Sequence, residues 1–323
     1  MRILVTGAGG AAAVSIWKSL GGDHELYMAD IDPLAAGLYL VPPERRLIIA
    51  RGDSPALVPD LLEACRARAI ELLVPTVDVE LAPLAAERTR FAQVGTTMAI
   101  SPLETLRLCR DKQALMNAVE GEVPCPSSVP LTPEIAAATT HFPRFAKPRE
   151  GAGSRGIARI DGPEDLASQP LDGTVMLQEY LPGEEVSVDV YVRADGRVIA
   201  AVARVRMKID SGIAVASRTI HDEPLLAAAR RTAEVIGIRG AANIQFKRAQ
   251  DGVYKLLEVN PRYPGTLPLT AAAGVDMPKL MVTELEGGKL PEGPMPFQDL
   301  MVVRYWTEEY FDTAQWEALC PRS

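Results

Sequence analysis

The chain has 323 residues, of which 47% are hydrophobic and 24% are charged, a composition typical of a globular protein and not of a disordered one. At this length we expect about two or three domains. The formal net charge of −8, without a local cluster of Lys and Arg, argues against nucleic-acid binding. The four cysteines lack the paired spacing of a zinc or dithiol site, which indicates free thiols in a reducing compartment.

No stretch reaches the roughly 18 uninterrupted apolar residues of a membrane span. The first residues are strand-like and do not form a basic region followed by a long apolar segment, so no signal peptide is indicated. We therefore expect a soluble, cytoplasmic protein with neither a membrane nor a nucleic acid as partner.

The N-terminal third of the chain alternates short apolar strands with amphipathic helices. This alternation is typical of a parallel sheet with helices on both faces. Ligands of such sheets bind beyond the carboxyl ends of the strands, where Gly7 to Gly10, Asp30 and residues 76–78 fall. The predicted elements are strands at 3–5, 25–29 and 71–75, a helix after residue 10 and a helix at 57–69.

The rest of the chain has a different pattern, in which strand pairs dominate. A helix is predicted at 102–118, and the proline-dense segment 122–130 follows it as the clearest boundary in the sequence. This pattern indicates an α+β fold with antiparallel sheets. The predicted elements are strand pairs 144–147 with 156–160 and 175–180 with 186–192, a strand at 198–206, a helix at 223–236 and a hairpin of 242–247 with 253–259.

A glycine motif follows the first predicted strand. Gly7, Gly9 and Ala12 have the spacing of a dinucleotide-binding fingerprint, and Asp30 stands where an acid that binds ribose is expected. The motif is short and easily matched. Taken alone it favours the alternative, a tight strand-to-helix turn that binds no nucleotide or binds another ligand.

A second glycine-rich loop follows Lys147, which ends a predicted strand. Backbone N–H groups and a serine hydroxyl in such a loop can hold phosphates, while Lys147 supplies a positive charge. The loop is not a Walker A motif, because no Gly-Lys-Ser/Thr closes it and a strand follows. The alternative is a glycine-rich hairpin that binds nothing. The residues concerned are Gly151, Gly153, Ser154 and Gly156.

Three polar side chains converge on the predicted C-terminal hairpin. Glu258 and Asn260 are two residues apart on one strand and so project from the same face, and the turn at 250–252 brings Gln245 opposite them. One carboxylate and two amide oxygens form an all-oxygen set that suits Mg²⁺. Arg262 adds a cation beside it. A solvated polar strand edge is the alternative, and it explains this convergence less well.

In chain order, these segments resemble the ATP-grasp superfamily, specifically the carbamoyl-phosphate-synthase-like carboxylate–amine ligases. The most specific likeness lies in Asn243-x-Gln245-Phe246 and in Glu258-Val259-Asn260-Pro261-Arg262, which are close to the family's metal-site sequences. Residues 3–10 and 74–81 resemble the Rossmann-like domain that precedes the grasp. In these ligases that domain often helps to hold the substrate instead of NAD, which argues against a dinucleotide at the first glycine motif.

The resemblance implies an α/β protein in two blocks: a Rossmann-like parallel-sheet domain over residues 1–105 and an ATP-grasp unit over 106–323. The grasp unit has two α+β subdomains, at about 112–180 and 181–300, which clamp ATP between them. The chain has one grasp unit, so it lacks the second synthetase half of a full carbamoyl phosphate synthase. A stand-alone ligase is the better fit.

The resemblance also implies roles for single residues. Lys112 and Lys147 contact the nucleotide phosphates, and Arg262 and Arg206 hold the acyl phosphate. Mg²⁺, or Mn²⁺ in its place, binds Gln245, Glu258 and Asn260. The hinge strand reads adenine and ribose; many family members have a glutamate at its first position, where this chain has an amide that can still accept a hydrogen bond. The hinge residues are Gln178, Glu179, Leu181 and Glu185.

The predicted function is an ATP- and Mg-dependent ligase that joins a carboxylate to an amine through an acyl phosphate and releases ADP and phosphate. Its partners are then a small carboxylate and a small amine, with a homodimer as one option for its assembly. An NAD-dependent oxidoreductase is the first alternative, but it leaves the metal set unexplained. A non-catalytic nucleotide-binding protein of the same fold is the second. The presence of both lysines and all three metal-site residues counts against it.

Overall fold

The N-terminal part of the chain forms a five-stranded parallel sheet in the order β3-β2-β1-β4-β5. The computed structural model describes residues 1–151, 156–210 and 212–319. In β1, Ile3, Leu4 and Val5 are fully buried, as expected when helices cover both faces of a parallel sheet. The strands are β1 (Arg2–Thr6), β2 (Glu25–Asp30), β3 (Arg46–Ile48), β4 (Leu72–Val74) and β5 (Thr97–Met98), and the helices are α1 (Ala11–Leu20), α2 (Leu57–Arg68), α3 (Asp78–Ala86) and α4 (Arg88–Gln93), with 3₁₀ turns at Ala36–Leu40 and Pro43–Arg45.

The turn after β1 requires a glycine. Gly7 has φ of 67°, and a Cβ at this position would lie 2.6 Å from side-chain atoms of both Thr76 and Val77. Only glycine adopts this conformation without strain and also allows the loop after β4 to approach so closely. The motif at Gly7 therefore has a structural reason of its own.

The predicted helix at 102–118 is wrong in one respect, because two helices occupy this segment. α5 (Leu103–Arg110) ends before Asp111, and α6 (Lys112–Val119) begins after it. The Asp111 carboxylate accepts hydrogen bonds from the backbone N–H groups of Gln113 and Ala114, at 3.0 and 3.2 Å. Asp is favoured at such an N-cap and disfavoured inside a helix, which explains the break.

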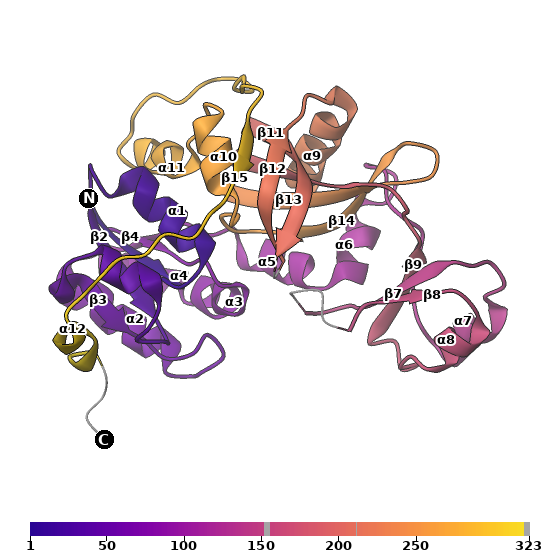
Figure 1. The fold of residues 1–323 in the computed structure, drawn as a ribbon, viewed down its shortest axis with the longest axis horizontal. Coiled ribbons are helices and arrows are strands. Elements are labelled where there is room, and N and C mark those ends of the chain that lie inside the picture. The colour runs from indigo at the N-terminus through magenta and orange to yellow at the C-terminus, as the bar shows by residue number, and fades with distance from the viewer. Residues whose placement is uncertain (152–155, 211, 320–323) are drawn as a thin grey trace.

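A small four-stranded antiparallel sheet follows, in the order β6-β9-β7-β8. The predicted pairing of 144–147 with 156–160 is present as β7 against β8. Figure 1 shows this sheet standing apart from the rest of the molecule at one end of its longest axis. The strands are β6 (Ser128–Pro130), β7 (Arg144–Pro148), β8 (Ala158–Ile160) and β9 (Val175–Glu179), and the helices are α7 (Pro133–Ala138) and α8 (Pro163–Ala167).

The central sheet has six strands in the order β14-β13-β10-β11-β12-β15, and all its pairs are antiparallel. The predicted pairing of 175–180 with 186–192 is wrong: β9 belongs to the small sheet, whereas β10 lies between β11 and β13. The chain leaves one sheet and enters the other across residues 180–184. The strands are β10 (Glu185–Val192), β11 (Val198–Asp210), β12 (Ile213–Thr219), β13 (Gly240–Arg248), β14 (Tyr254–Asn260) and β15 (Met301–Val303), and the helices are α9 (Glu223–Val235), α10 (Leu267–Ala272), α11 (Met277–Leu285) and α12 (Thr313–Glu317).

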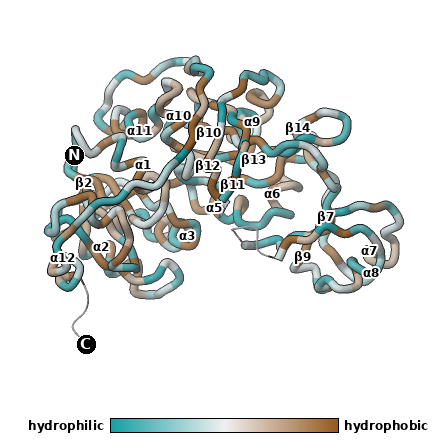
Figure 2. Tube along the Cα trace, in the orientation of Figure 1, coloured by the Kyte–Doolittle hydropathy of each residue, from teal (hydrophilic) through white to brown (hydrophobic). Residues whose placement is uncertain are grey.

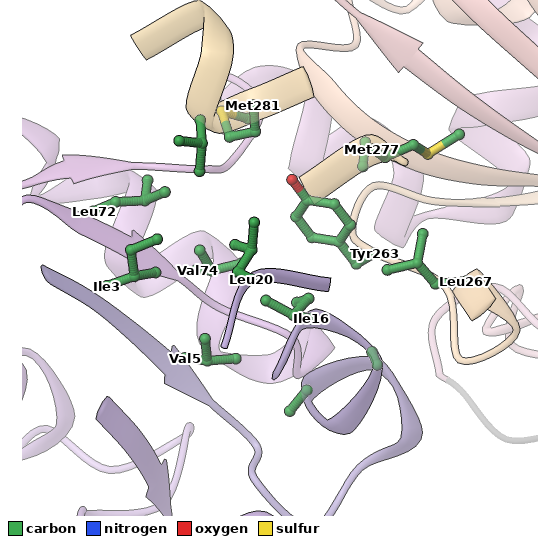
Figure 3. Packing of buried hydrophobic residues seen from close by; sticks show 14 of the residues in the cluster. Ile3, Val5, Ile16, Leu20, Leu72, Val74, Tyr263, Leu267, Met277 and Met281 are labelled. Carbon is green, nitrogen blue, oxygen red and sulfur yellow. The ribbon is translucent and has the colours of Figure 1, made fainter. Parts of the chain in front are cut away.

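One hydrophobic core joins the N-terminal sheet to the central part of the molecule. Ile16 and Leu20 of α1 lie in the same cluster as Tyr263, Leu267 and Met277, all at most 2% exposed (Figure 3). Burial of this size contributes about 1.5–3 kcal/mol for each large apolar side chain. The two sheets are therefore held together by a continuous apolar contact.

Hydrophilic segments lie mainly at the periphery of the fold, and the hydrophobic ones lie mainly in strands and inner helices (Figure 2). In the described ranges we find no helix of the length and apolar character that crossing a bilayer requires. The observed architecture confirms the predicted α/β fold, with a parallel N-terminal sheet followed by antiparallel sheets.

Candidate functional site

Two adjoining cavities lie between the three sheets. The larger, about 780 Å³, opens between the small sheet and the central sheet; we call it the interlobe cavity. The smaller, about 410 Å³, lies between the glycine turn after β1 and the central sheet; we call it the N-terminal cavity. The two share a junction whose polar side chains are Asp78, Arg206, Gln245, Asn260 and Arg262, with Gly212 and Ile213 beside them.

Most residues predicted to contact the nucleotide line the interlobe cavity. Gly156 is described but is not part of its wall. Gly153 and Ser154 lie outside the described residues. The predicted residues that do line the cavity are Lys112, Lys147, Gly151, Gln178, Glu179, Leu181 and Glu185.

Lys147 is the buried cation of this cavity. It is 6% exposed, and its Nζ donates to the backbone carbonyl of Leu257 on β14 at 3.1 Å. Burial lowers the pKa of Lys147 to about 8; the nearby Glu258 carboxylate acts in the opposite direction, and Lys112 lowers it further. A buried ammonium with one carbonyl partner is well suited to meet a negatively charged ligand.

Lys112 approaches the same cavity from the start of α6. Its Nζ donates to the carbonyl of Gly151 at 2.8 Å, and its backbone N–H donates to the carbonyl of Arg149 at 2.9 Å. Arg149 in turn forms an ion pair with Asp111, the N-cap residue of α6. These contacts join α6 to the loop that follows β7.

The hinge between the small and central sheets places its residues in the wall of the cavity. The Gln178 amide is 1% exposed and donates to the hydroxyl of Ser128 at 2.8 Å. The Glu179 carboxylate accepts two hydrogen bonds from Lys255, at 2.7 and 2.8 Å. This ion pair ties the end of β9 to β14, and Leu181 provides an apolar wall that is 4% exposed.

The predicted metal set lies on adjacent strands of the central sheet. Gln245 on β13 stands directly opposite Glu258 on β14, and Asn243 stands opposite Asn260. A register shift between Gln245 and Phe246 produces this pairing. The Asn260 amide donates to Glu258 Oε1 at 3.3 Å. Across the described ranges no Lys or Arg forms an ion pair with Glu258, so its charge is available to a cation.

The Gln245 side chain has two workable amide orientations. In one, Nε2 donates to Asn243 Oδ1 at 3.3 Å. In the other, Nε2 donates to Glu258 Oε1 at 3.2 Å, and the amide oxygen accepts from Asn260 Nδ2 at 3.3 Å. The group can thus present its oxygen or its nitrogen to this edge.

This donor set fits a hard divalent cation, because it offers a carboxylate and two amide oxygens on neighbouring strands. It has only one carboxylate. In agreement with this, residues 1–151, 156–210 and 212–319 contain no cluster of three or more His, Cys, Asp or Glu side chains that would hold a metal by themselves.

Arg206 contacts both Glu185, which was predicted to meet a ribose, and Gln245 of the predicted metal set. Its Nη1 contacts the Glu185 carboxylate in an ion pair and donates to Gln245 Oε1 at 3.3 Å. Its Nη2 donates to the carbonyl of Gly212 at 2.7 Å, which holds the β11–β12 turn against the junction. The sequence did not predict that Glu185 and Arg206 are partners.

Arg262 is held by the N-terminal domain. Its Nε and Nη2 donate to the two oxygens of Asp78, both at 2.7 Å. Asp78 is the first residue of α3, at the carboxyl end of β4. The sequence placed both residues near a site, but it gave no sign that they form a bidentate pair.

The first glycine motif lines the N-terminal cavity. Asp30 does not stand free there: its Oδ2 accepts from the Gly9 N–H at 2.8 Å, and its Oδ1 accepts from the Asp32 N–H at 3.0 Å. Both oxygens thus satisfy backbone groups of their own domain. This geometry favours the interpretation of the motif as a turn over that of a ribose site.

Sequence reasoning did not bring together the polar floor of the N-terminal cavity, although Asn243 lies in the segment that resembles the family's metal-site sequence. Ser187, Arg204 and Asn243 line it, and each is at most 5% exposed. A signal was present: in β10, the polar residues Glu185, Ser187 and Asp189 alternate with valines, the pattern of a strand with one polar face.

Two family models match the chain. Residues 3–99 match the family described as "PylC-like, N-terminal domain", and residues 172–309 match the family described as "ATP-grasp in the biosynthetic pathway with Ter operon". The first range contains the parallel sheet. The second contains β9, the central sheet and the predicted metal set.

Solved structures share the whole arrangement of sheets at low sequence identity. Biotin carboxylase from Campylobacter jejuni, in complex with β,γ-ATP, is 19% identical over 90% of this chain and 72% of its own, with a TM-score of 0.74. The biotin carboxylase domain of a 2-oxoglutarate carboxylase from Hydrogenobacter thermophilus, in complex with MgADP, ADP and bicarbonate, is 17% identical over 92% and 72%, with a TM-score of 0.74. N5-carboxyaminoimidazole synthetase from Staphylococcus aureus, complexed with ADP, is 14% identical over 93% and 81%, with a TM-score of 0.71.

Proposed function

We propose that the chain, whose residues 172–309 match an ATP-grasp family model, is an ATP-dependent ligase that joins a carboxylate to an amine and releases ADP and phosphate. The observation that carries this proposal is the junction between the two cavities. Gln245 and Asn260 line both cavities, and Glu258 lines the interlobe one. A nucleotide in the interlobe cavity and an acid in the N-terminal cavity would therefore meet at this set.

Nucleotide binding is assigned to the lysines and the hinge. Lys147 and Lys112 meet phosphate charge, and Glu185 meets the ribose hydroxyls once Arg206 releases it. Gln245, Glu258 and Asn260 would hold Mg²⁺, which supplies charge neutralisation to the terminal phosphates when it is bound. Nucleotide binding itself is supported by the fold, since structures of the same fold were solved with ADP and with MgADP.

The reaction has two steps. A carboxylate oxygen of the acid bonds to the γ-phosphorus while the bond from that phosphorus to the β–γ bridging oxygen breaks, so ADP leaves and an acyl phosphate forms. The amine nitrogen then bonds to the acyl carbon, inorganic phosphate leaves, and the nitrogen loses a proton. Arg262, fixed by Asp78, and Arg206 hold the negatively charged oxygens through both steps.

Positioning supplies most of the rate in such a reaction, because the protein forms no covalent bond to either substrate. The buried Lys147 and the bidentate Asp78–Arg262 pair are suited to this, since both are fixed before a ligand arrives.

The free thiols of Cys65, Cys109 and Cys125 are consistent with a cytoplasmic location.

Release of ADP from MgATP over a panel of small acids crossed with small amines tests the proposal, with mass spectrometry of the product as confirmation. We expect fast ADP release only where an acid and an amine are both present. Slow release with the acid alone is also consistent with the proposal, because the acyl phosphate forms before the amine reacts. A thermal-shift comparison should show stabilisation by MgATP and none by NAD(H). Stabilisation by NAD(H) alone would favour the oxidoreductase, and nucleotide binding without ADP release over the panel would favour the non-catalytic protein.

A further inference from the structure

A row of polar side chains crosses the central sheet from the proposed metal set into the N-terminal cavity. Glu258 on β14 stands opposite Gln245 on β13, Gln245 stands opposite Ser187 on β10, and Ser187 stands opposite Arg204 on β11. Directly opposite residues of an antiparallel pair share a face. The valines that alternate with Ser187 lie in the core on the other face.

Arg204 is fixed within a buried network. Its Nε and Nη2 donate to the two oxygens of Asp189 at 2.9 and 2.8 Å, and the side chains are 3% and 0% exposed. Asn243 and Thr270 also donate to Asp189, at 2.7 and 2.5 Å. Asp189 thus has four donors, and its charge is balanced by Arg204.

One guanidinium nitrogen of Arg204 is not used by this network. Within the described ranges, its Nη1 has no hydrogen-bond acceptor, whereas Nε and Nη2 are both engaged. Arg204 lines the N-terminal cavity. A fixed cation with a spare donor at a cavity wall is a site where an anionic oxygen can bind at little entropic cost.

Ser187 provides the second observation. It is 2% exposed and lines the same cavity, and no described residue forms a hydrogen bond with its hydroxyl. Its oxygen is not among the fully buried unpartnered side-chain atoms of the described residues, so it faces the cavity, where a ligand can reach it. Since no described residue forms a hydrogen bond with this hydroxyl, it holds no other element of the fold in place.

The charges around the cavity are consistent with an added anion. Arg206 and Arg262 have their own carboxylate partners, Glu185 and Asp78. Arg304 has no carboxylate partner in the described part of the chain. It donates to the backbone carbonyl of Gly265, which lines the N-terminal cavity. Burial lowers the pKa of Arg304, and the charge of Arg204 lowers it further. The Asp30 carboxylate at the cavity wall is engaged by backbone N–H groups.

We propose that Ser187 and Arg204 bind a second anionic group of the acid substrate, while its reacting carboxylate lies at the junction beside Asn260 and Arg262. This inference rests on the proposed function and narrows its substrate class. The acid then carries two anionic groups, the second being a carboxylate or a phosphate. Ser187 donates its hydroxyl to that group, and Arg204 donates through Nη1.

Calorimetric titration of the full chain, saturated with MgADP, tests this with matched pairs of acids. Glutarate is compared with valerate, and 3-phosphoglycerate with glycerate, so that each pair differs mainly in the second anionic group. We expect the dianionic member of one pair to bind about tenfold more tightly or better, the value of one or two hydrogen bonds to a charged group. The pair that shows this preference identifies carboxylate or phosphate.

Two variants test the residues. Ser187→Ala removes a hydroxyl with no protein partner, so thermal unfolding should stay unchanged while the preference falls about tenfold. Arg204→Lys keeps a cation beside Asp189 but removes the spare nitrogen, and it should also reduce the preference. Ser217→Ala is the matched control: Ser217 is fully buried and its hydroxyl donates to Val205 at 2.7 Å, so this variant should lose stability and keep the preference.

Equal binding of both members of every pair, no binding of any acid, or an undiminished preference in Ser187→Ala would each overturn the inference. The proposed ligase activity is judged separately by ADP release. Fast ADP release with monoanionic acids would leave the ligase proposal intact and refute this inference. Preferential binding of a dianionic acid that depends on Ser187, without ADP release in the presence of any amine, would support the anion site and refute the ligase proposal.

Discussion

Arg262 and Asp78 form a bidentate ion pair, with both N–O distances at 2.7 Å, that joins the strand end after β14 to the first turn of α3. The two residues are 184 positions apart in the chain. Two parallel hydrogen bonds fix the plane of the guanidinium as well as its position. The pair therefore ties the N-terminal domain to the junction where the two substrates are proposed to react.

Asp78→Asn should leave Arg262 without its anionic partner while preserving the size of the side chain. We expect turnover to fall about tenfold or more because Arg262 loses its fixed orientation, and the free energy of unfolding to fall by about 1–2 kcal/mol, since the pair is partly exposed. Steady-state kinetics and urea unfolding measure the two effects. Asp53→Asn, which breaks the exposed pair with Arg51, is the control and should change neither. Equal turnover in Asp78→Asn and Asp53→Asn would show that Asp78 does not orient Arg262 for the reaction.

Glu258→Gln should abolish turnover while nucleotide binding persists. Glu258 is the only carboxylate in the proposed metal set, so its neutralisation weakens the cation site without altering the hinge. ADP release and calorimetry with MgADP measure the two properties. Glu184→Gln, at an exposed carboxylate that accepts from the Tyr254 hydroxyl at 2.7 Å, is the control and should keep activity. Near-normal ADP production by Glu258→Gln would show that the metal assignment is wrong.

Lys147 should make nucleotide affinity depend on pH. Its pKa is lowered to about 8 by burial, so the unliganded protein loses this positive charge above that pH. We expect the affinity for a non-hydrolysable MgATP analogue to fall as the pH rises from 8 to 10, and the affinity for adenosine to change little. In Lys147→Ala, analogue binding should be weak and lack this fall. An identical pH profile in both proteins would exclude Lys147 as its source.

The same shift has a defined sign for stability. The unfolded chain keeps its lysines protonated to about pH 10.4, so between pH 8 and that value the unfolded state binds more protons than the native state. The contribution of Lys147 to the free energy of unfolding therefore rises with pH in this window. The unfolding free energy of Lys147→Ala, subtracted from that of the parent at each pH, isolates the effect.

Glu80 should carry an opposite dependence at lower pH. It is 3% exposed, and burial raises its pKa to about 7, against the effect of a hydrogen bond from Thr6 at 2.5 Å; the charge of Asp30 raises it further. Between the unfolded value near 4.3 and pH 7 the native state binds more protons, so stability falls as the pH rises through this range. Glu80→Gln should remove this fall. The free energy of unfolding of the variant minus that of the parent should therefore be larger at pH 8 than at pH 4.5, by on the order of 1–3 kcal/mol. Parallel stability curves for the two proteins would contradict this.

Local patterns in the sequence determined the features that depend on near neighbours. Alternating strands and helices predicted the parallel sheet, because strand and helix have different apolar periods. The short turn at 250–252 predicted the hairpin that brings Gln245 near Glu258, but a register shift between Gln245 and Phe246 sets the two directly opposite each other. Asp111 broke the predicted helix for an equally local reason, since its side chain caps the next helix.

Only the tertiary structure decided the features that depend on segments far apart in the chain. The sequence could not show that β9 and β10 separate into different sheets, because both strands offer similar apolar edges and their partners are chosen by global packing. The Asp78–Arg262 pair and the burial of Lys147 likewise arise where separate sheets meet. The unpartnered hydroxyl of Ser187 has the same origin: alternation places it on the polar face of β10, but the N-terminal domain docked above that face turns it into the floor of a cavity.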